Sequence, residues 1–412
     1  MNKFLNWKLF ITSKFLTKER NSKSWSVFIL STFAVALSIA VMIISISTLK
    51  GFKNQIKSKI YQVQGDFIID SGKNTESGEP EPIENTIAED LLKLDSCPWI
   101  NSISPSIMKS CILKSDEEIE GIIAKSTEEN LVNGPLKGYI QHGNKKLTQN
   151  GCAISKLIAT KLQVETGETL IAVFFLEDYT GRAKPRARKL KIEGIYETGI
   201  DQIDGNLMFV NSELLLPLTV ENHWYSQIEI RINTELIEKS KAKKRLLVSL
   251  PNANVQVKSI EEDNQSIFDW LAILNTNVLI ILVLMSIVAI ITMSTTLLIL
   301  VIERTSVIGL LFTMGARFKD VQRIFHYQAL IISLFGIVFG TLIAAIIIFG
   351  QNYFQWIQLP QEIYFVDQVI LDWNVKDVII VNLASVFLIF MSLYIPAKFV
   401  KKIQPIKAVR FK

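Results

Sequence analysis

Hydrophobic and polar positions divide the chain into four long apolar runs and one long polar segment. Each apolar run can cross a hydrocarbon core of roughly 30 Å, which takes about 20 residues in a helix. One run precedes the polar segment, and three follow it. The pattern therefore predicts four transmembrane helices, at residues 25–49, 270–302, 324–350 and 378–397.

The polar segment, residues 50–269, alternates short strand-like and helix-like patterns. Runs rich in β-branched and aromatic residues predict strands at Phe67–Asp70, Ile103–Leu113, Glu118–Ala124, Thr169–Phe175, Leu190–Tyr196, Leu207–Val210, Gln227–Ile232 and Asn254–Val257. Apolar residues at helical spacing predict helices at Ile83–Leu94, Ile154–Leu162 and Thr234–Val248. The last strand, helix and strand are expected to form a βαβ unit. Residues 182–191, with Pro185 and six bases, are expected to form a solvated hairpin loop.

These patterns define the expected fold class. It is an α-helical membrane protein with four transmembrane helices plus a large α+β extracytoplasmic (periplasmic) domain inserted between helices 1 and 2. Within the third span, Gly336 and Gly340 are four residues apart. Small residues at that spacing let two helices approach closely, so we expect this pair to pack against another helix.

Residues 1–24 combine apolar side chains at helical spacing with lysines. This pattern predicts an amphipathic helix at the cytoplasmic membrane interface, with an ordinary basic flank as the alternative. The apolar stretch that follows is longer than the roughly 7–15 residues in the apolar region of a signal peptide, and no small-residue cleavage site comes after it. The first span is therefore expected to be retained in the protein.

Local charge predicts the orientation, within a net charge of +5. Lys and Arg in short loops stay on the cytoplasmic side of a membrane. Residues 1–23 carry six bases and one acid, the tail 398–412 carries six bases and no acid, and the loop 303–323 carries four bases and two acids. The loop 351–377 has one base and four acids. Both termini are therefore expected in the cytoplasm of a cell with an inner membrane, and residues 50–269 and 351–377 outside it.

Few residues indicate chemistry of the chain's own. Cys97, Cys111 and Cys152 all lie in the polar segment; buried or free thiols and one internal disulfide both remain open, and their spacing suggests no metal site. The sequence has no Gly-rich phosphate loop ending in Gly-Lys-Ser/Thr, no catalytic triad, and no ionisable residue within a span away from the helix ends. We expect a non-catalytic chain with no cofactor and no nucleic-acid partner, driven by an engine that another protein supplies.

The loop after the second span carries a recognisable signature. The chain there resembles the FtsX-like/MacB-type ABC transporter permease family, through Glu303, Ile308, Gly309, Leu311, Met314, Gly315 and Ala316. Phe312 stands where the family usually has Arg or Lys. Residues 395–410 also resemble the closing motif of the family.

Further blocks resemble the lipoprotein-releasing (LolC/LolE) permeases within this family. Leu49-Lys50-Gly51-Phe52 stands where those permeases often have Met-Asn-Gly-Phe. Residues 194–204 resemble their pattern Gly-x-Phe-x-Ser/Thr-Gly followed by Asp, and residues 154–170 and the opening around Trp7 are also similar. The polar segment is longer than the domain of FtsX-type permeases, and the chain lacks the ATPase that MacB-type chains carry.

The resemblance implies a permease subunit of an ABC transporter that extracts lipoproteins from the outer leaflet of the inner membrane. A separate cytosolic ATPase subunit, using ATP and Mg, would supply the energy. The residues that would couple the chain to that ATPase are Glu303, Thr305, Ile308, Gly309, Leu311, Phe312, Thr313, Met314, Gly315 and Ala316.

The substrate's acyl chains would enter between the first two spans. The residues expected to line that path are Ile43, Ile46, Leu49, Phe268, Leu271 and Leu274; the alternative is that they face lipid or pack internally. The implied partners are a second permease chain (identical or paralogous), membrane lipid, the lipoprotein and a periplasmic carrier. Two other functions stay open: an FtsX/MacB-type mechanotransmission or efflux permease with another envelope substrate, and a membrane sensor or scaffold.

Overall fold

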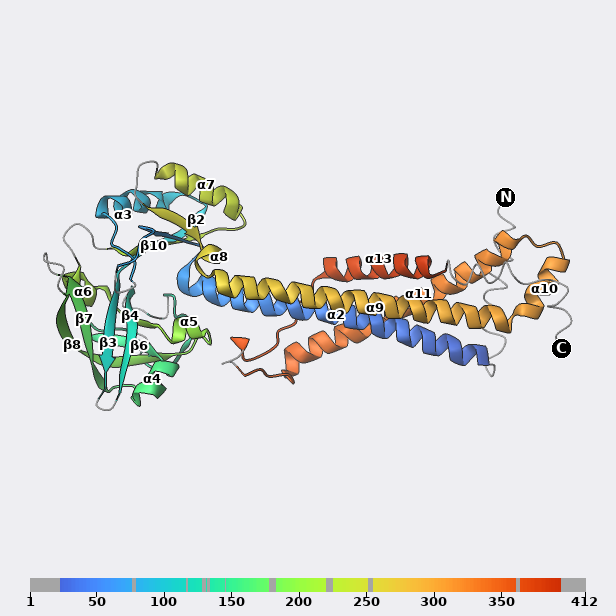
Figure 1. The fold of residues 1–412 in the computed structure, drawn as a ribbon, viewed down its shortest axis with the longest axis horizontal. Coiled ribbons are helices and arrows are strands. Elements are labelled where there is room, and N and C mark those ends of the chain that lie inside the picture. Colours follow the sequence, from blue (N-terminus) through green and yellow to red (C-terminus); the bar gives the residue numbers. More distant parts are fainter. Residues whose placement is uncertain are drawn as a thin grey trace. The chain divides into compact units, whose positions relative to one another are not determined.

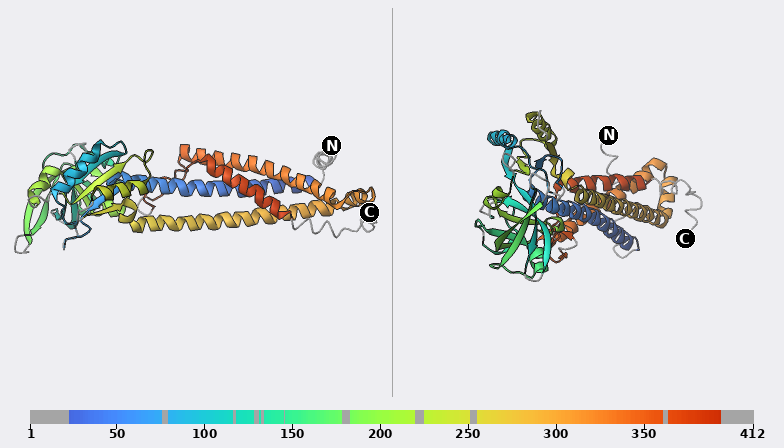
Figure 2. Two further views of the ribbon diagram at one scale, coloured as in Figure 1. Left: turned by 90° about the horizontal axis from the view of Figure 1, so that it is seen from above. Right: turned by 60° about the vertical axis from the view of Figure 1, so that its left-hand side comes forward.

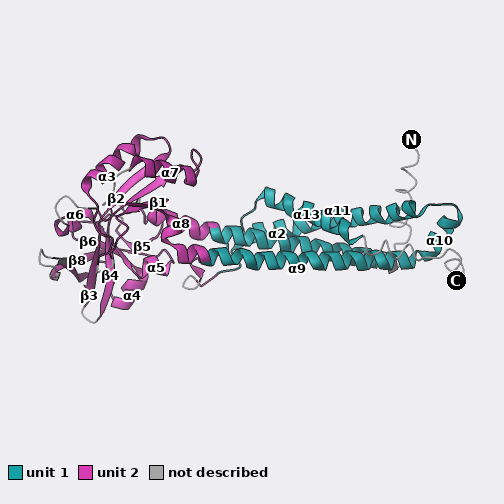
Figure 3. Ribbon diagram, turned by 45° about the horizontal axis from the view of Figure 1, so that its top comes forward, with its two compact units in different colours: residues 1–53, 270–358, 368–412 teal, residues 54–269, 359–367 magenta. Residues whose placement is uncertain are grey.

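The computed structural model describes residues 23–75, 79–115, 118–127, 131, 134–144, 146–177, 183–219, 225–250, 255–360 and 364–393 (Figure 1). The amphipathic segment expected before the first span, apart from residues 23 and 24, and the motif at residues 395–410 lie outside these residues. The chain forms two compact units (Figure 3). Unit 1 comprises residues 1–53, 270–358 and 368–412, and unit 2 comprises residues 54–269 and 359–367.

Four helices are long and apolar enough to cross a membrane, among the residues described. They are α2 (Lys23–Gln64), α9 (Gln265–Glu303), α11 (Phe318–Phe354) and α13 (Val375–Ser392). Three of them are longer than the apolar runs that predict them. Helix α2 continues past Leu49 because Ile56, Ile60 and Val63 lie on one helical face and are fully buried. This face has the spacing of an amphipathic helix.

Helices α2 and α11 pack closely in unit 1, as the small-residue spacing predicts. A Cβ atom on Gly336 would lie 2.7 Å from Val35 Cγ1, and one on Gly340 would lie 2.7 Å from the Ala36 carbonyl oxygen. Only glycine leaves room for the α2 backbone at that distance. The expected packing role of the two glycines is confirmed.

Polar side chains join the other helices of unit 1. The Ser31 and Thr296 hydroxyls share a hydrogen bond between α2 and α9. The Ser294 hydroxyl of α9 donates to the Ser392 carbonyl of α13 at 3.1 Å. Helix α13 runs beside α11 (Figure 2), and the Asn382 amide donates to the Thr341 hydroxyl between them at 3.2 Å. Interhelical hydrogen bonds of this kind add about 0.6–2 kcal/mol each in a membrane.

Unit 2 contains a four-stranded sheet in the order β11-β1-β10-β2. Its strands are β1 (Phe67–Asp70), β2 (Ile100–Ser106), β10 (Gln227–Ile232) and β11 (Gln256–Ser259). Helices α3 (Asn85–Leu92) and α7 (Lys239–Ser249) bury apolar side chains against it. Both β10 and β11 pair antiparallel with β1 between them, so they run parallel to each other. The expected βαβ unit is therefore present, with β1 inserted.

The second part of unit 2 is a seven-stranded sheet in the order β5-β8-β6-β9-β4-β3-β7. An additional β7–β8 pairing closes it into a barrel, from which β5 projects as an extra strand on β8. The strands are β3 (Met108–Lys114), β4 (Ile119–Thr127), β5 (Ile140–Gly143), β6 (Gly151–Ser155), β7 (Thr169–Glu177), β8 (Ala183–Tyr196) and β9 (Leu207–Asn211). Apolar side chains such as Leu113, Ile154 and Phe174 fill the core. Closure leaves fewer free strand edges.

Buried ion pairs hold these two parts of unit 2 together. The Lys125 ammonium of β4 contacts the Glu229 carboxylate of β10, and both side chains are almost fully buried. The Lys109 ammonium of β3 contacts the Glu79 carboxylate at 2.7 Å, also away from solvent. Breaking a buried pair by removing one partner costs about 3–5 kcal/mol, because the other charge stays buried.

Several expected elements differ in the structure. The strand expected at Ile103–Leu113 is two strands, because β2 ends at Ser106 and β3 starts at Met108 in the other sheet. The helix expected from Ile154 begins at Lys156 as α4 (Lys156–Leu162), since Ser155 ends β6 and caps the helix through its hydroxyl. The helix expected from Thr234 begins at Lys239, after a turn in which Asn233 accepts the Leu236 N–H.

The prediction of a loop at residues 182–191 is wrong for the residues that the structure describes there. Residues from Ala183 onward belong to β8, which pairs with β7 as far as Lys191. Most of this part of β8 is exposed, so it has the basic, polar composition of a loop while its backbone is held in a ladder. Pro185 is tolerated there because it pairs with Phe175 near the end of the hairpin, where few ladder bonds are lost.

Candidate functional site

A short helix, α10 (Thr305–Thr313), lies between α9 and α11 in unit 1 (Figure 1). Helix α9 ends at Glu303, and Arg304 leaves the helical conformation with φ −98° and ψ 14°. The Arg304 N–H still donates to the Leu300 carbonyl at 3.1 Å, and the Ile308 N–H donates to the Arg304 carbonyl at 2.9 Å. The hydrogen-bond ladder therefore runs almost unbroken from α9 into α10.

The end of α10 is a Schellman motif centred on Gly315. The Ala316 N–H donates to the Leu311 carbonyl at 2.9 Å, and the Gly315 N–H donates to the Phe312 carbonyl at 3.0 Å. Gly315 has φ +87°, in the left-handed region that favours glycine. The motif turns the chain sharply, and α11 begins at Phe318.

The expected coupling residues fall on two different faces of α10. Ile308 and Gly309 are buried, and Phe312 packs against the helical core of unit 1 together with Ala316. Met314 is 75 % exposed. Glu303, Thr313 and Gly315 are also exposed, whereas Thr305 and Leu311 are half-buried. Part of the set therefore anchors α10, and part of it faces outward.

One outward residue was missed by sequence reasoning. Leu310 is 56 % exposed, and it precedes Met314 by one helical turn. The signal was available in the spacing, because residues four apart share one helical face. Phe312 stands where the family usually has a base, and in the structure its ring packs against the helical core of unit 1.

The Leu49–Phe52 block fixes a chain crossing in unit 1. A Cβ atom on Gly51 would lie 1.8 Å from the Ile370 carbonyl oxygen, so the segment before α13 passes directly over this glycine. The Asp372 N–H donates to the Ser47 carbonyl at 3.1 Å, and the Lys50 ammonium contacts Asp377 at 2.6 Å. The glycine in this block is therefore required by close backbone approach.

The 194–204 block of unit 2 builds a fixed loop. The Asp204 carboxylate accepts the Thr198 hydroxyl at 2.7 Å and the Gly199 N–H at 2.8 Å, and Gly199 has φ +74°. Burial raises the pKa of Asp204, and the hydrogen bonds from Thr198 and Gly199 oppose that rise. The Gly and Asp of this block therefore close a turn; they do not form an open ligand site.

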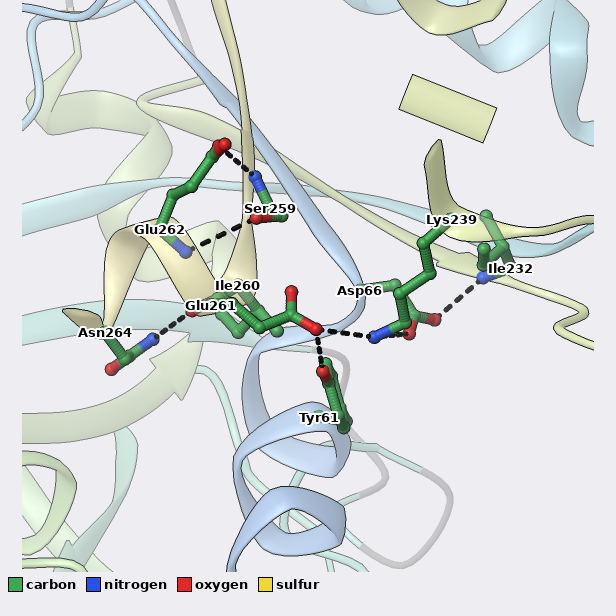
Figure 4. A network of polar contacts seen from close by, with 9 residues as sticks. All are labelled: Tyr61, Asp66, Ile232, Lys239, Ser259, Ile260, Glu261, Glu262 and Asn264. Atoms are coloured by element: carbon green, nitrogen blue, oxygen red, sulfur yellow. Dashed lines mark hydrogen bonds and ion pairs between the residues drawn. The ribbon is translucent and has the colours of Figure 1, made fainter. Parts of the chain in front are cut away.

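A polar network joins the end of α2 to the start of α9 within unit 2 (Figure 4). The Tyr61 hydroxyl donates to the Glu261 carboxylate on α8 (Ile260–Asp263). The Lys239 ammonium contacts the same carboxylate at 3.2 Å and Asp66 at 3.4 Å, and it lies 3.6 Å from the centre of the Tyr61 ring. One lysine therefore ties α2, the residue before β1 and α8 together, through charge and cation–π contacts.

The same junction continues to Asn264, the residue directly before α9. Ser259 and Glu262 form a capping box at the start of α8, in which each side chain accepts the other residue's N–H. The Asn264 amide donates to the Gln64 side-chain oxygen at 2.7 Å, and the Ile260 N–H donates to the Asp66 carbonyl at 3.1 Å. The C-terminal end of α2 and the segment that leads into α9 are thus held together at one place in unit 2.

Comparisons with known proteins agree with this architecture. A family model described as "MacB-like periplasmic core domain" matches residues 28–262, more than half of the chain, and a model described as "FtsX-like permease C-terminal" matches residues 279–405. The chain belongs to the FtsX-like, MacB-type ABC transporter permease family.

Curated relatives align with this permease over nearly its whole length. A protein named "Lipoprotein-releasing system transmembrane protein LolC" from Xylella fastidiosa is 21% identical, over 96% of each chain. LolE from Haemophilus influenzae is 22% identical, over 97% of this chain and 98% of its own. LolC from Neisseria meningitidis is 21% identical, over 96% of each chain.

The residues expected to line a substrate path have mixed surroundings in the permease. Ile43 is 2 % exposed and belongs to the packed core of unit 1, and Leu271 is 1 % exposed. Ile46, Leu49 and Leu274 are half-buried. Phe268 belongs to unit 2, where its ring lies 6.4 Å from that of Tyr61. The helices would have to separate before a ligand could reach Ile43.

The three cysteines of the permease are free thiols in the structure. Burial raises the pKa of Cys111 to about 12, and it also raises the pKa of Cys152. A thiol that stays protonated is a poor nucleophile and a poor metal ligand. Among the residues described, no cluster of His, Cys, Asp and Glu could hold a metal ion.

Proposed function

We propose that this permease extracts lipoproteins from the outer leaflet of the inner membrane, powered by a separate ATPase subunit. One observation supports this choice of substrate above all: the chain aligns from end to end with proteins named as lipoprotein-releasing LolC and LolE. Removing a lipid anchor from a bilayer costs about 0.8 kcal/mol per buried CH₂ group. An ATP-driven partner would provide that free energy.

In this proposal α10 is the contact with the ATPase. Leu310 and Met314 project an apolar surface that a groove on a cytosolic protein could receive. Ile308, Gly309 and Phe312 join the helix to the core, so a displacement of α10 would move α9 and α11 with it. The ATPase uses ATP and Mg; this chain supplies the mechanical path.

The acyl chains would enter between α2 and α9. In the structure Ile43 is closed off in the core, so entry requires the two helices to part. The Ser31–Thr296 hydrogen bond would break in that step. Each hydroxyl also lies within hydrogen-bond distance of a carbonyl of its own helix, at 2.6 and 2.7 Å, so the one that donates between the helices can donate to that carbonyl instead when they separate.

The remaining partners follow from the same proposal. A second permease chain, identical or paralogous, would complete the path through the membrane, and a periplasmic carrier would receive the released lipoprotein. Both termini and α10 would lie in the cytoplasm, because their flanking loops are rich in Lys and Arg.

Photocrosslinking tests the substrate. A photoreactive residue is placed at Ile46 or Phe268, in a complex with the ATPase and the second permease chain, with Phe387 on α13, 64 % exposed, as the control position. We expect adducts with a triacylated lipoprotein at the first two positions and few at Phe387. A complex that hydrolyses ATP but gives no adducts at either position would contradict lipoprotein extraction. It would favour a MacB-type or FtsX-type permease with another envelope substrate.

A further inference from the structure

The C-terminal end of α2, in unit 2, carries a lysine that bridges two distant parts of the chain. The Lys59 ammonium donates to the Thr198 carbonyl at 2.7 Å and to the Phe365 carbonyl at 2.9 Å. Asp367, Asp204 and Glu197 also interact with its charge. All of these residues belong to unit 2. Hydrogen bonds from an ammonium are roughly twice as strong as neutral ones, so this lysine is a strong tie.

The first carbonyl belongs to the fixed turn of the 194–204 block. Asp204 binds the N–H and hydroxyl of Thr198 and the N–H of Gly199, so the Thr198 carbonyl has little freedom. The Ser155 hydroxyl donates to the Asp204 carbonyl and joins the turn to the barrel. Lys59 is therefore bound to a rigid point of the barrel.

The second carbonyl belongs to a segment that leaves unit 1 and returns to it. Residues 359–367 are part of unit 2, while the chain on either side, which leads to α11 and α13, is part of unit 1. The Leu359 N–H donates to the Asp367 carbonyl at 2.9 Å, and Val366 is 1 % exposed. Phe365 has φ +62°, an unfavourable conformation for a bulky residue. Such strain persists only where surrounding contacts hold it.

We propose that Lys59 is a positioning residue which ties residues 364–367 to the end of α2 and to the barrel, and so gives the chain between α11 and α13 a mechanical link into unit 2, beside the continuous helices α2 and α9. The inference rests on the proposed function, because it assumes that movement starts where the ATPase contacts α10. Movement that starts at α10 displaces α11, with α13 packed beside it. Through residues 364–367 and Lys59, that movement reaches the end of α2 and the barrel together. Without the ammonium, the loop and the barrel would respond separately.

The test compares four variants of the full chain in lipid nanodiscs. Lys59→Met removes the charge and keeps the approximate length of the side chain, and Lys59→Gln removes the charge but keeps an amide NH₂ that can donate. Lys59→Arg keeps the charge. Lys57→Met is the matched control, because Lys57 lies on the same helix and its ammonium lies 5.7 Å from the centre of the Phe268 ring.

The first measurement is amide hydrogen exchange in the chain alone. We expect Lys59→Met to speed exchange at residues 197–199 and 364–367 together, by about tenfold or more, because the ammonium donates a charge-assisted hydrogen bond to each segment. Lys59→Gln should give a smaller increase, and Lys59→Arg and Lys57→Met none. Unchanged exchange at residues 364–367 in both Lys59→Met and Lys59→Gln would overturn the inference.

The second measurement uses the complex with the ATPase, whose ATP-dependent exchange is followed in both segments. In the wild type we expect the exchange rates of the two segments to change together when ATP is added. In Lys59→Met the exchange rate of only one segment should change. The amount of lipoprotein released per ATP should fall about fivefold, with the KM for ATP unaltered. If both segments still change together in Lys59→Met, the link is wrong. If no ATPase binds the wild-type chain, the proposed function fails, while hydrogen exchange in the chain alone still decides on Lys59.

Discussion

Neighbouring residues of α10 have opposite surroundings. Ile308 is 2 % exposed and packs in the helical core of unit 1, whereas Leu310, two positions later, is 56 % exposed. Ile308, Gly309 and Met314 belong to a signature that sequence comparison finds as one motif; the structure shows that the motif combines anchoring and outward residues. A sequence motif records which residues occur together, but only packing shows which way each side chain points.

At this scale we predict separate effects for the two faces of α10. Leu310→Asp together with Met314→Lys should abolish co-purification with the ATPase and leave the thermal stability of the chain nearly unchanged, because surface substitutions cost about 0.5 kcal/mol or less. Ile308→Ala should instead destabilise the chain by about 2–5 kcal/mol, as large-to-small core substitutions do. Affinity purification and thermal unfolding measure the two effects. Normal ATPase binding by the Leu310/Met314 variant would rule out this face as the contact.

Elements were predicted well where one local signal sufficed. Apolar length predicts the four long helices, and the small-residue spacing predicts the contact of α11 with another helix. The closed barrel could not be predicted, because β7–β8 pairing brings a basic, exposed strand into a ladder that its composition does not indicate. The extension of α2 to Gln64 was also missed, although Ile56, Ile60 and Val63 carried its helical spacing.

The contact between α2 and α11 gives a prediction for this scale. Gly340→Ala should destabilise the helical unit by about 1–3 kcal/mol, because the new methyl group would lie 2.7 Å from the Ala36 carbonyl oxygen. Leu342→Ala on the same helix is the control, since Leu342 is 54 % exposed. Thermal unfolding in one detergent compares the two. Equal stability of Gly340→Ala and the wild type would show that the helices can move apart at no cost.

The junction at α8 predicts a dependence on pH. The Lys243 ammonium and the Ser259 N–H lower the pKa of Glu262. Burial alone would raise the pKa of Glu261, but the Tyr61 hydroxyl and Lys239 outweigh it, so this pKa is lowered as well. Because both pKa values fall on folding, the stabilisation is complete above the ordinary Glu pKa of 4.5 and is lost as the pH drops through the lowered values.

Thermal unfolding of the full chain at a series of pH values checks this. We expect the wild type to lose stability below a pH of about 4.5, and the double variant Glu261→Gln with Glu262→Gln to be less stable at neutral pH but less sensitive to acid. Glu89→Gln, an exposed position on α3, should behave like the wild type. An acid response of the double variant as steep as that of the wild type would mean that other groups are responsible.

At the scale of the whole molecule, the two units are joined by the chain itself. Helices α2 and α9 both cross from one unit to the other, and residues 359–367 belong to unit 2 between two segments of unit 1. The sequence predicted a domain carried between two spans, but the place of residues 359–367 in unit 2 had no sequence signal, because it depends on contacts between distant segments such as Lys59 and Phe365.

We propose that this permease uses the work of a separate ATPase to release lipoproteins. The most direct measurement is ATP-dependent release of a triacylated lipoprotein from proteoliposomes that contain the permease, its second permease chain and the ATPase. We expect release to require ATP and to be lost in the Leu310→Asp with Met314→Lys variant. An assembled complex that hydrolyses ATP while the lipoprotein stays in the membrane would contradict it.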